Sequence, residues 1–310
     1  MNRDIDARDI DLDRPDSSRG GRGGGQDRIT PTDEPREALT RDLDLPRGPR
    51  RERVRRGSWE GDLRGSEVRM LATAGAFRVV PMDELRRPDD RTQAHRKEIE
   101  RLRGMDLVRT MPYIVGRDRT TLVTLTERGR DLLEAARRER SAEPRQAFYA
   151  GVSKSRELAH DARVHQAYLE VCKRLDQRGL TVRRVVLEQE LKRDYQTFLQ
   201  EPNRGRREST GRPQRDADEV ARWAREHSLP IVDDHVQFPD LRLECEGRDG
   251  RQEIEDVEVI TPHYRGAHAA AKVSAGFTRY GAIGARLSGA SGSRRSGRGR
   301  DVRLAEEMLS

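Results

Sequence analysis

The sequence predicts an α/β protein with two ordered domains between disordered ends. Three observations carry this prediction. The chain has 310 residues, which is enough for two ordinary domains. Only 33% of them are apolar and 38% are charged, so a core cannot enclose the whole chain. Between about residues 64 and 284, segments with helical spacing of apolar residues alternate with short β-type runs.

The charge balance favours a polyanionic partner, and double-stranded DNA is the first candidate. Lys and Arg number 62 against 55 Asp and Glu, which gives a net charge of +7. A generally arginine-rich composition is the alternative explanation. Cys172 and Cys245 have no ligand spacing around them, so neither a disulfide framework nor a zinc site is indicated. No stretch approaches eighteen apolar residues, so we expect a cytoplasmic protein without a membrane partner.

Both ends of the chain are predicted to be disordered. Residues 1–63 form an Arg/Gly/Asp-rich arm, and residues 285–310 form a Gly/Ser/Arg-rich tail. Within the arm, "RGGRGGG" (19–25) and "RGPRRERVRR" (47–56) are typical of flexible segments that lie along phosphates. A solvated linker is the equal alternative for each of them.

Residues 64–140 follow a helix–helix–hairpin–helix order. The second predicted helix, 92–103, places Ile99 and Leu102 on one face and ends at Gly104. Two β-type runs follow around the turn at 116–119, and "ERGRDLLEAARRER" returns to helix. This order is the plan of a winged helix-turn-helix DNA-binding domain.

The second helix is expected to enter a DNA groove, and the hairpin tip to reach the backbone or minor groove. The segment 64–140 carries 18 basic against 13 acidic residues. The residues expected to contact DNA are Gln93, His95, Arg96, Lys97 and Arg101 on the helix, with Arg117 and Arg119 at the hairpin tip. The alternative is a winged helix used for protein contacts, with these charges merely solvated.

Two stretches resemble the MarR-type winged helix. They are "LRGMDLVRT" and "VGRDRTTLVTLTERGRDLL", which together cover about 60 residues. The closing "LTERGRDLL" is the more specific motif. The resemblance implies DNA binding, and one reading of it is a MarR-type transcriptional regulator whose second domain serves dimerisation or partner binding.

Residues 146–284 are predicted to form a second α/β domain, whose most informative part is the acidic hairpin "FPDLRLECEGRDGRQEIEDVEV" (238–259). A five-residue loop would place Leu241 opposite Val257 and Asp240 opposite Glu258. This register buries apolar side chains against each other and places Asp240, Asp256 and Glu258 on one face of the hairpin. Two helices are expected to flank the hairpin in sequence, "ADEVARWAREHSLP" before it and 267–283 after it.

Carboxylates gathered in this way suit Mg²⁺ or Mn²⁺, which prefer oxygen ligands. We expect Asp240 and Asp256 to be the metal ligands. The metal would lower the pKa of a bound water and polarise a phosphodiester, and Lys272 would stabilise charge on the transition state. The alternative is the solvated face of a sheet edge. His160 and His165, at i, i+5 spacing on a helix, do not converge on a metal and are expected to be structural.

The hairpin and its surroundings resemble the PD-(D/E)xK nuclease fold, in which "PD" would be Pro239-Asp240. The resemblance implies a nuclease-like domain with a mixed sheet, with Glu258 assisting and an upstream glutamate, Glu190, joining the site; Glu188 is the poorer choice. The triplet Asp256-Val257-Glu258 ends in glutamate where lysine is expected. Either Lys272 supplies the missing cation from the next helix, or the domain is inactive and only binds DNA.

The arrangement as a whole is similar to the replication-relaxation family of plasmid and mobile-element proteins. The matching pieces, within 66–283, are "RELAHDARVHQAYLEV", "VVLEQELKR", "FPDLRL", "IEDVEV" and "KVSAGFTRY". The resemblance implies a DNA-binding protein that acts in replication, relaxation or transfer. A relaxase or replication protein and a second copy of the chain are the candidate partners. A third reading is a relaxosome accessory that binds at an origin without cutting.

Overall fold

The computed structural model describes residues 37–85, 92–115, 118–138, 144–152, 157–203, 215–260 and 267–281. The predicted Gly-rich segment at 19–25 and the predicted tail lie outside these residues. So do Arg117 at the hairpin tip and the side chain of Gln93.

The chain is α/β, as the sequence predicts. The helices are α1 (Gly65–Phe77), α2 (Thr92–Gly104), α3 (Glu127–Ala135), α4 (Leu158–Gln177), α5 (Glu188–Gln200), α6 (Ala217–Glu226) and α7 (Ala267–Ser274), with short 3-10 helices η1 (Ala38–Thr40), η2 (Met82–Leu85) and η4 (Glu201–Asn203). The strands are β1 (Glu52–Arg56), β2 (Trp59–Leu63), β3 (Val80–Pro81), β4 (Val108–Val115), β5 (Asp118–Leu125), β6 (Leu180–Leu187), β7 (Ile231–Val232), β8 (His235–Val236), β9 (Leu241–Gly247), β10 (Gln252–Ile260) and β11 (Thr278–Gly281).

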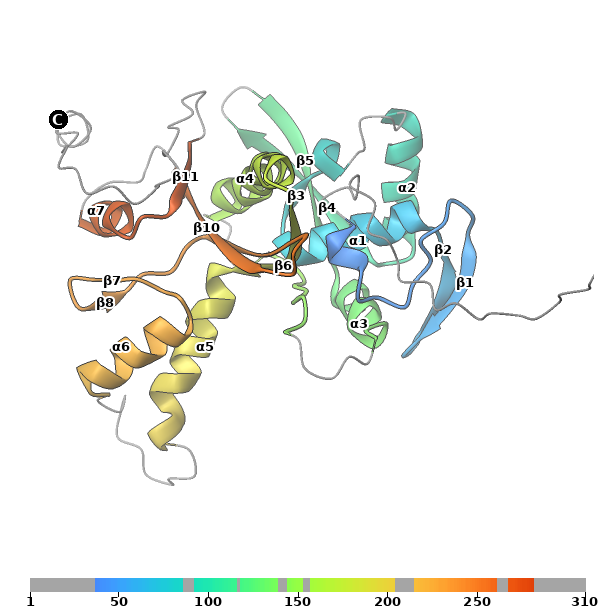
Figure 1. Cartoon of the computed structure of the whole chain (residues 1–310). Helices are drawn as coiled ribbons and strands as arrows, with labels where there is room; N and C mark the ends of the chain where they lie inside the picture. Colours follow the sequence, from blue (N-terminus) through green and yellow to red (C-terminus); the bar gives the residue numbers. More distant parts are fainter. Residues whose placement is uncertain are drawn as a thin grey trace, which may run out of the picture. The chain divides into compact units, whose positions relative to one another are not determined.

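The first region, residues 37–138, contains a three-stranded antiparallel sheet in the order β3–β5–β4, with α1, α2 and α3 (Figure 1). Its elements follow the predicted helix–helix–hairpin–helix order. The helix α3 begins after Thr126, whose Oγ1 accepts a hydrogen bond from the Gly129 amide at 3.0 Å. A Cβ at Gly129 would lie 2.1 Å from the carbonyl oxygen of Leu107, so only glycine fits in "LTERGRDLL".

Residues 37–63 are ordered, which corrects the prediction that 1–63 form one disordered arm. They form η1 and the hairpin β1–β2, and they bury Leu43, Trp59 and Leu63. Charged residues dominate the hairpin, but a few large apolar side chains anchor it to the core. Arg53 also pairs with Glu60 across the two strands at 3.0 Å.

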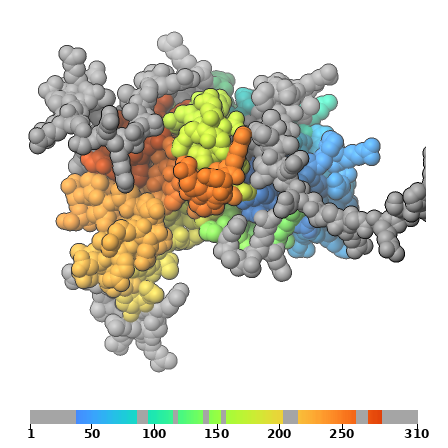
Figure 2. Space-filling view, viewed as in Figure 1, coloured from blue at the N-terminus to red at the C-terminus, as the bar shows by residue number. Residues whose placement is uncertain are grey.

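The second region, residues 157–281, is built on a four-stranded mixed sheet in the order β11–β10–β9–β6. The strands β6, β9 and β10 are antiparallel, and β11 is parallel to β10. The predicted hairpin register is confirmed, because Leu241 lies opposite Val257. The apolar face of the sheet packs with Tyr168 and Val171 of α4. In Figure 2 the atoms of α4 (yellow-green) and of the β9–β10 hairpin (orange) meet on the face shown.

Two predicted helices are shorter than expected. Within the predicted stretch 146–178, the described helix is α4, Leu158–Gln177, and residues 146–152 are not helical. There the Tyr149 amide donates to the Gly75 carbonyl of the first region at 2.8 Å. The stretch 267–283 is helical only to Ser274, because Gly276 has a φ of 78° and the chain continues as β11.

Two side-chain contacts complete the packing of the second region. The helices α5 and α6 lie side by side (Figure 1), where Phe198 stacks on Trp223 with centroids 5.6 Å apart. Trp223 and Phe277 are buried. The side chain of Gln146 bonds both the amide and the carbonyl of Val185 in β6, each at 2.9 Å.

Among the helices that the structure describes, none is long and apolar enough to cross a membrane.

Candidate functional site

The helix α2 has a buried face and a charged exposed face. Ile99 and Leu102 are fully buried against the first region's core, which fixes the rotation of the helix about its axis. Arg96 and Lys97 lie on the opposite side and are exposed. Arg119 on β5 is also exposed. Three of the residues predicted to contact DNA therefore lie on the surface.

Two other predicted DNA contacts turn inward. His95 is only 2% exposed, and its Nε2 lies 2.8 Å from the Met82 carbonyl oxygen. Arg101 is half-buried, and it donates to Glu67 at 3.2 Å and to the Asp62 carbonyl at 2.8 Å. Both residues hold α2 to its neighbours, so neither is placed on the exposed basic face.

Buried Glu67 is the centre of that internal network, and no motif in the sequence marks it. Its carboxylate pairs with Arg51 at 3.0 Å as well as with Arg101, and it caps α1 by accepting from the Arg64 amide at 3.0 Å. The β1–β2 hairpin is thus connected to α2 through one buried acid.

The second region contains a group of buried and half-buried ionisable side chains, which we call the acid cluster: His160, Glu188, Asp240, Glu258 and Lys272. Asp240 and Glu258 are 7% and 2% exposed and lie at the predicted facing positions of the hairpin. The Lys272 Nζ lies 2.7 Å from Glu258 Oε1, 3.4 Å from Asp240 Oδ1 and 3.6 Å from Glu188 Oε1. The His160 Nε2 lies 3.2 Å from Asp240 Oδ2.

The pKa values of three members of the acid cluster are shifted toward their charged forms. Burial alone would raise the pKa of Asp240, but His160 and Lys272 outweigh it and hold that pKa below its ordinary value. Burial alone would lower the pKa of Lys272, but Asp240 and Glu258 raise it. Burial also opposes the charging of His160, yet its hydrogen bonds with Asp161 and Asp240 raise its pKa to about 10.

Asp256, a predicted metal ligand, lies on the same sheet face but has a partner of its own. Arg242 donates to both of its oxygens, from Nε at 2.7 Å and from Nη2 at 2.8 Å. Arg242 also bonds the Ser228 carbonyl at 3.0 Å, so the pair links β9 and β10 to the loop after α6. Burial raises the pKa of Asp256 despite the pairing with Arg242.

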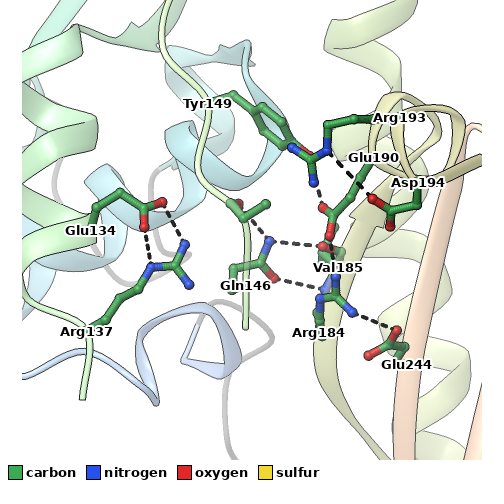
Figure 3. A network of polar contacts seen from close by, with 11 residues as sticks. Glu134, Arg137, Gln146, Tyr149, Arg184, Val185, Glu190, Arg193, Asp194 and Glu244 are labelled. Carbon is green, nitrogen blue, oxygen red and sulfur yellow. Dashed lines mark hydrogen bonds and ion pairs between the residues drawn. The ribbon is translucent and has the colours of Figure 1, made fainter. Parts of the chain in front are cut away.

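Glu190, the predicted upstream glutamate, is also held elsewhere. Its carboxylate accepts from the Tyr149 hydroxyl at 3.0 Å and pairs with Arg184 (Figure 3). Glu188 faces Lys272 instead. Residues two apart on a helix point about 200° away from each other, so only one of these two first-turn glutamates can face Lys272.

The acid cluster does not fit a divalent metal ion in this arrangement. Carboxylate oxygens are suitable ligands for Mg²⁺ or Mn²⁺, but Lys272 contacts both oxygens of Glu258, at 2.7 and 2.9 Å. The Val259 amide donates to Asp240 Oδ2 at 2.8 Å. Across the described residues, no three metal-ligating side chains are grouped to hold an ion. The lysine ammonium lies between Asp240 and Glu258, and Arg242 holds Asp256, the other predicted metal ligand.

Sequence reasoning missed His160 and ranked Glu188 below Glu190. His160 lies on α4, 80 residues before Asp240, and no local motif marks the contact.

Comparison with known proteins found no matching family model, and neither a curated protein nor a solved structure is significantly similar to the chain. The family resemblances therefore stay predictions that rest on the quoted motifs.

Proposed function

We propose that the protein binds double-stranded DNA through α2 and the β4–β5 hairpin, in the manner of a winged helix. The observation that carries this proposal is the order α1, β3, η2, α2, β4, β5, with β5 central in the sheet and the basic face of α2 exposed. That order matches a winged helix-turn-helix, in which the helix before the hairpin enters the major groove.

The side chains support this docking. Arg96 and Lys97 are neighbours on the exposed face of α2, where arginine can contact guanine or phosphate and lysine can contact phosphate. Arg119 stands near the hairpin tip, from which a wing reaches the DNA backbone. The buried side of α2 fixes which residues face the duplex, so the basic face is presented by a rigid element.

We further infer that the second region has a nuclease-like fold but does not cut DNA. The sequence of α4, β6, β9, β10, α7 and β11 supports the fold, with Asp240, Glu258 and Lys272 meeting on adjacent elements. The cation between the two carboxylates belongs to the protein itself, which argues against metal-dependent cleavage. A role in the replication, relaxation or transfer of a plasmid or mobile element rests on the motif resemblance.

The DNA-binding proposal is tested with fluorescence anisotropy on a labelled duplex at several salt concentrations. The variant Arg96→Gln/Lys97→Gln should bind about tenfold or more weakly, with a salt dependence reduced by about two phosphate contacts. The matched control is Lys173→Gln/Arg174→Gln on α4, where both side chains are exposed. Equal affinity of the α2 variant and the control would contradict the proposal.

A plasmid assay tests the second part separately. Supercoiled plasmid is incubated with the protein in Mg²⁺ or Mn²⁺, beside Asp240→Asn. We expect no nicking by either protein. Metal-dependent nicking that the substitution abolishes would overturn the non-cutting assignment and leave the DNA-binding proposal untouched.

A further inference from the structure

A cleft of about 470 Å³ lies where α3, the segment 144–150 and the start of α5 meet the end of α1. We call it the arginine cleft. Two acidic side chains, Glu134 and Glu190, also line it, so the lining has an excess of three positive charges. Its five arginines are Arg78, Arg130, Arg137, Arg145 and Arg193.

Both carboxylates of the cleft already have partners. Arg137 donates to Glu134 at 2.6 Å. Glu190 is held by Arg184, which does not line the cleft, and by the Tyr149 hydroxyl (Figure 3). Arg130 also has a carboxylate partner, Asp131 at 3.0 Å, which lies outside the lining.

Arg78 is held in position by neutral groups. Its guanidinium lies over the Tyr149 ring, 4.8 Å from the centroid, and it donates to the side-chain oxygen of Gln189. Its Nε is buried and has no hydrogen-bond partner among the described residues. A fixed guanidinium with an unused donor is a typical anion-binding group.

Arg193 adds a second cation on the open side of the cleft. Its side chain is 64% exposed, and its Nε forms an exposed ion pair with Asp194 Oδ1 at 3.6 Å (Figure 3). Arg78 precedes the second region and Arg193 lies within it, so an anion between them would contact both regions of the chain.

We propose that the arginine cleft binds phosphate groups. Arginine forks match phosphate oxygens in pairs, and the cleft is within the size range of small-ligand sites. The rings of Phe148 and Tyr149 are already covered by Arg137 and Arg78, so stacking on a nucleobase is disfavoured and charge governs recognition. The phosphates come either from a free phosphorylated small molecule or from the DNA backbone. In the second case the inference rests on the proposed function and extends its footprint.

The test uses the full chain and two probes: inorganic pyrophosphate by isothermal titration calorimetry, and a short duplex by fluorescence anisotropy. The cleft variant is Arg78→Gln/Arg193→Gln. The control Arg174→Gln/Arg222→Gln removes the same charge from exposed positions outside the cleft. The cleft variant should bind at least one probe about tenfold more weakly, while the control stays within about twofold.

The pyrophosphate and duplex assays distinguish the two possible sources of the phosphate groups. Loss of pyrophosphate binding identifies a free phosphorylated ligand, and loss of duplex binding alone identifies the DNA backbone. If the double variant is unfolded by circular dichroism, Arg193→Gln alone is used, with an expected loss of about threefold or more. The inference is overturned if neither probe binds the cleft variant more weakly than the control. Pyrophosphate binding without any duplex binding would refute the proposed function and retain this inference.

Discussion

The acid cluster and the arginine cleft concentrate charge in opposite ways. In the acid cluster, carboxylates are buried and surrounded by the protein's own cations, Lys272 and His160. In the arginine cleft, cations line an accessible hollow, and Arg193 remains 64% exposed.

The difference separates a structural use of charge from a binding use. Buried charges must be paired, because an unpaired charge in the interior is costly. Solvent screens the repulsion between exposed charges of one sign, and together such charges attract a ligand of the opposite charge. The acid cluster should therefore govern stability, and the arginine cleft should govern ligand affinity.

The largest expected effect is the loss of Lys272. The change Lys272→Met removes the cation that lies between buried Asp240 and Glu258 and should lower the free energy of unfolding by about 3–5 kcal/mol at neutral pH. Urea denaturation measures it. The control Lys192→Met removes an exposed i, i+4 pair with Glu188 and should cost less than about 0.5 kcal/mol. Equal costs would mean that the acid cluster is not a stabilising unit.

The next effect is the pH dependence that His160 introduces. Its pKa is raised from 6.5 to about 10 by Asp161 and Asp240 against the opposing effect of burial. A group with a raised folded-state pKa contributes its full stability below the unfolded value, and this contribution is lost as the pH rises toward 10. Unfolding free energies from pH 6.5 to 10 should fall more steeply in the wild type than in His160→Gln, by on the order of 1 kcal/mol after allowing for solvent screening. Parallel curves would contradict the assignment.

The smallest effect is expected in the arginine cleft. Arg193→Gln should change the free energy of unfolding by less than about 0.5 kcal/mol, because its ion pair with Asp194 is exposed to solvent. Thermal denaturation beside Arg174→Gln provides the comparison. A loss of stability above about 1 kcal/mol would assign Arg193 a structural role.

Much of the sheet and part of the acid cluster could be predicted from the sequence. Alternation of Leu241 and Leu243 with charged neighbours decides the hairpin register, because only one register keeps charge out of the core. That register places Asp240 opposite Glu258. Lys272 could be expected nearby because it follows on the next helix, and the structure brings it to both carboxylates.

The rest depends on contacts between residues far apart in the chain. His160 meets Asp240 only because α4 packs on the sheet. Arg242 pairs with Asp256. From the sequence, an arginine on the same strand face as Asp240 and Glu244 could equally be an exposed surface charge. The β1–β2 hairpin is rich in charge, and its order comes from Trp59 and Leu63, which fill a core built by later segments. The spacing of apolar residues within a short stretch of sequence does not predict these contacts between distant segments.

The side chain of Gln146 has a consequence for the exposed edge of the second sheet. β6 is an outer strand among the described strands, and an outer strand offers unpaired backbone groups to any other strand. Gln146 donates to the Val185 carbonyl and accepts from its amide, so one amide side chain imitates the peptide group of a neighbouring strand. At Val185 the edge strand therefore has no backbone group left to pair with another strand.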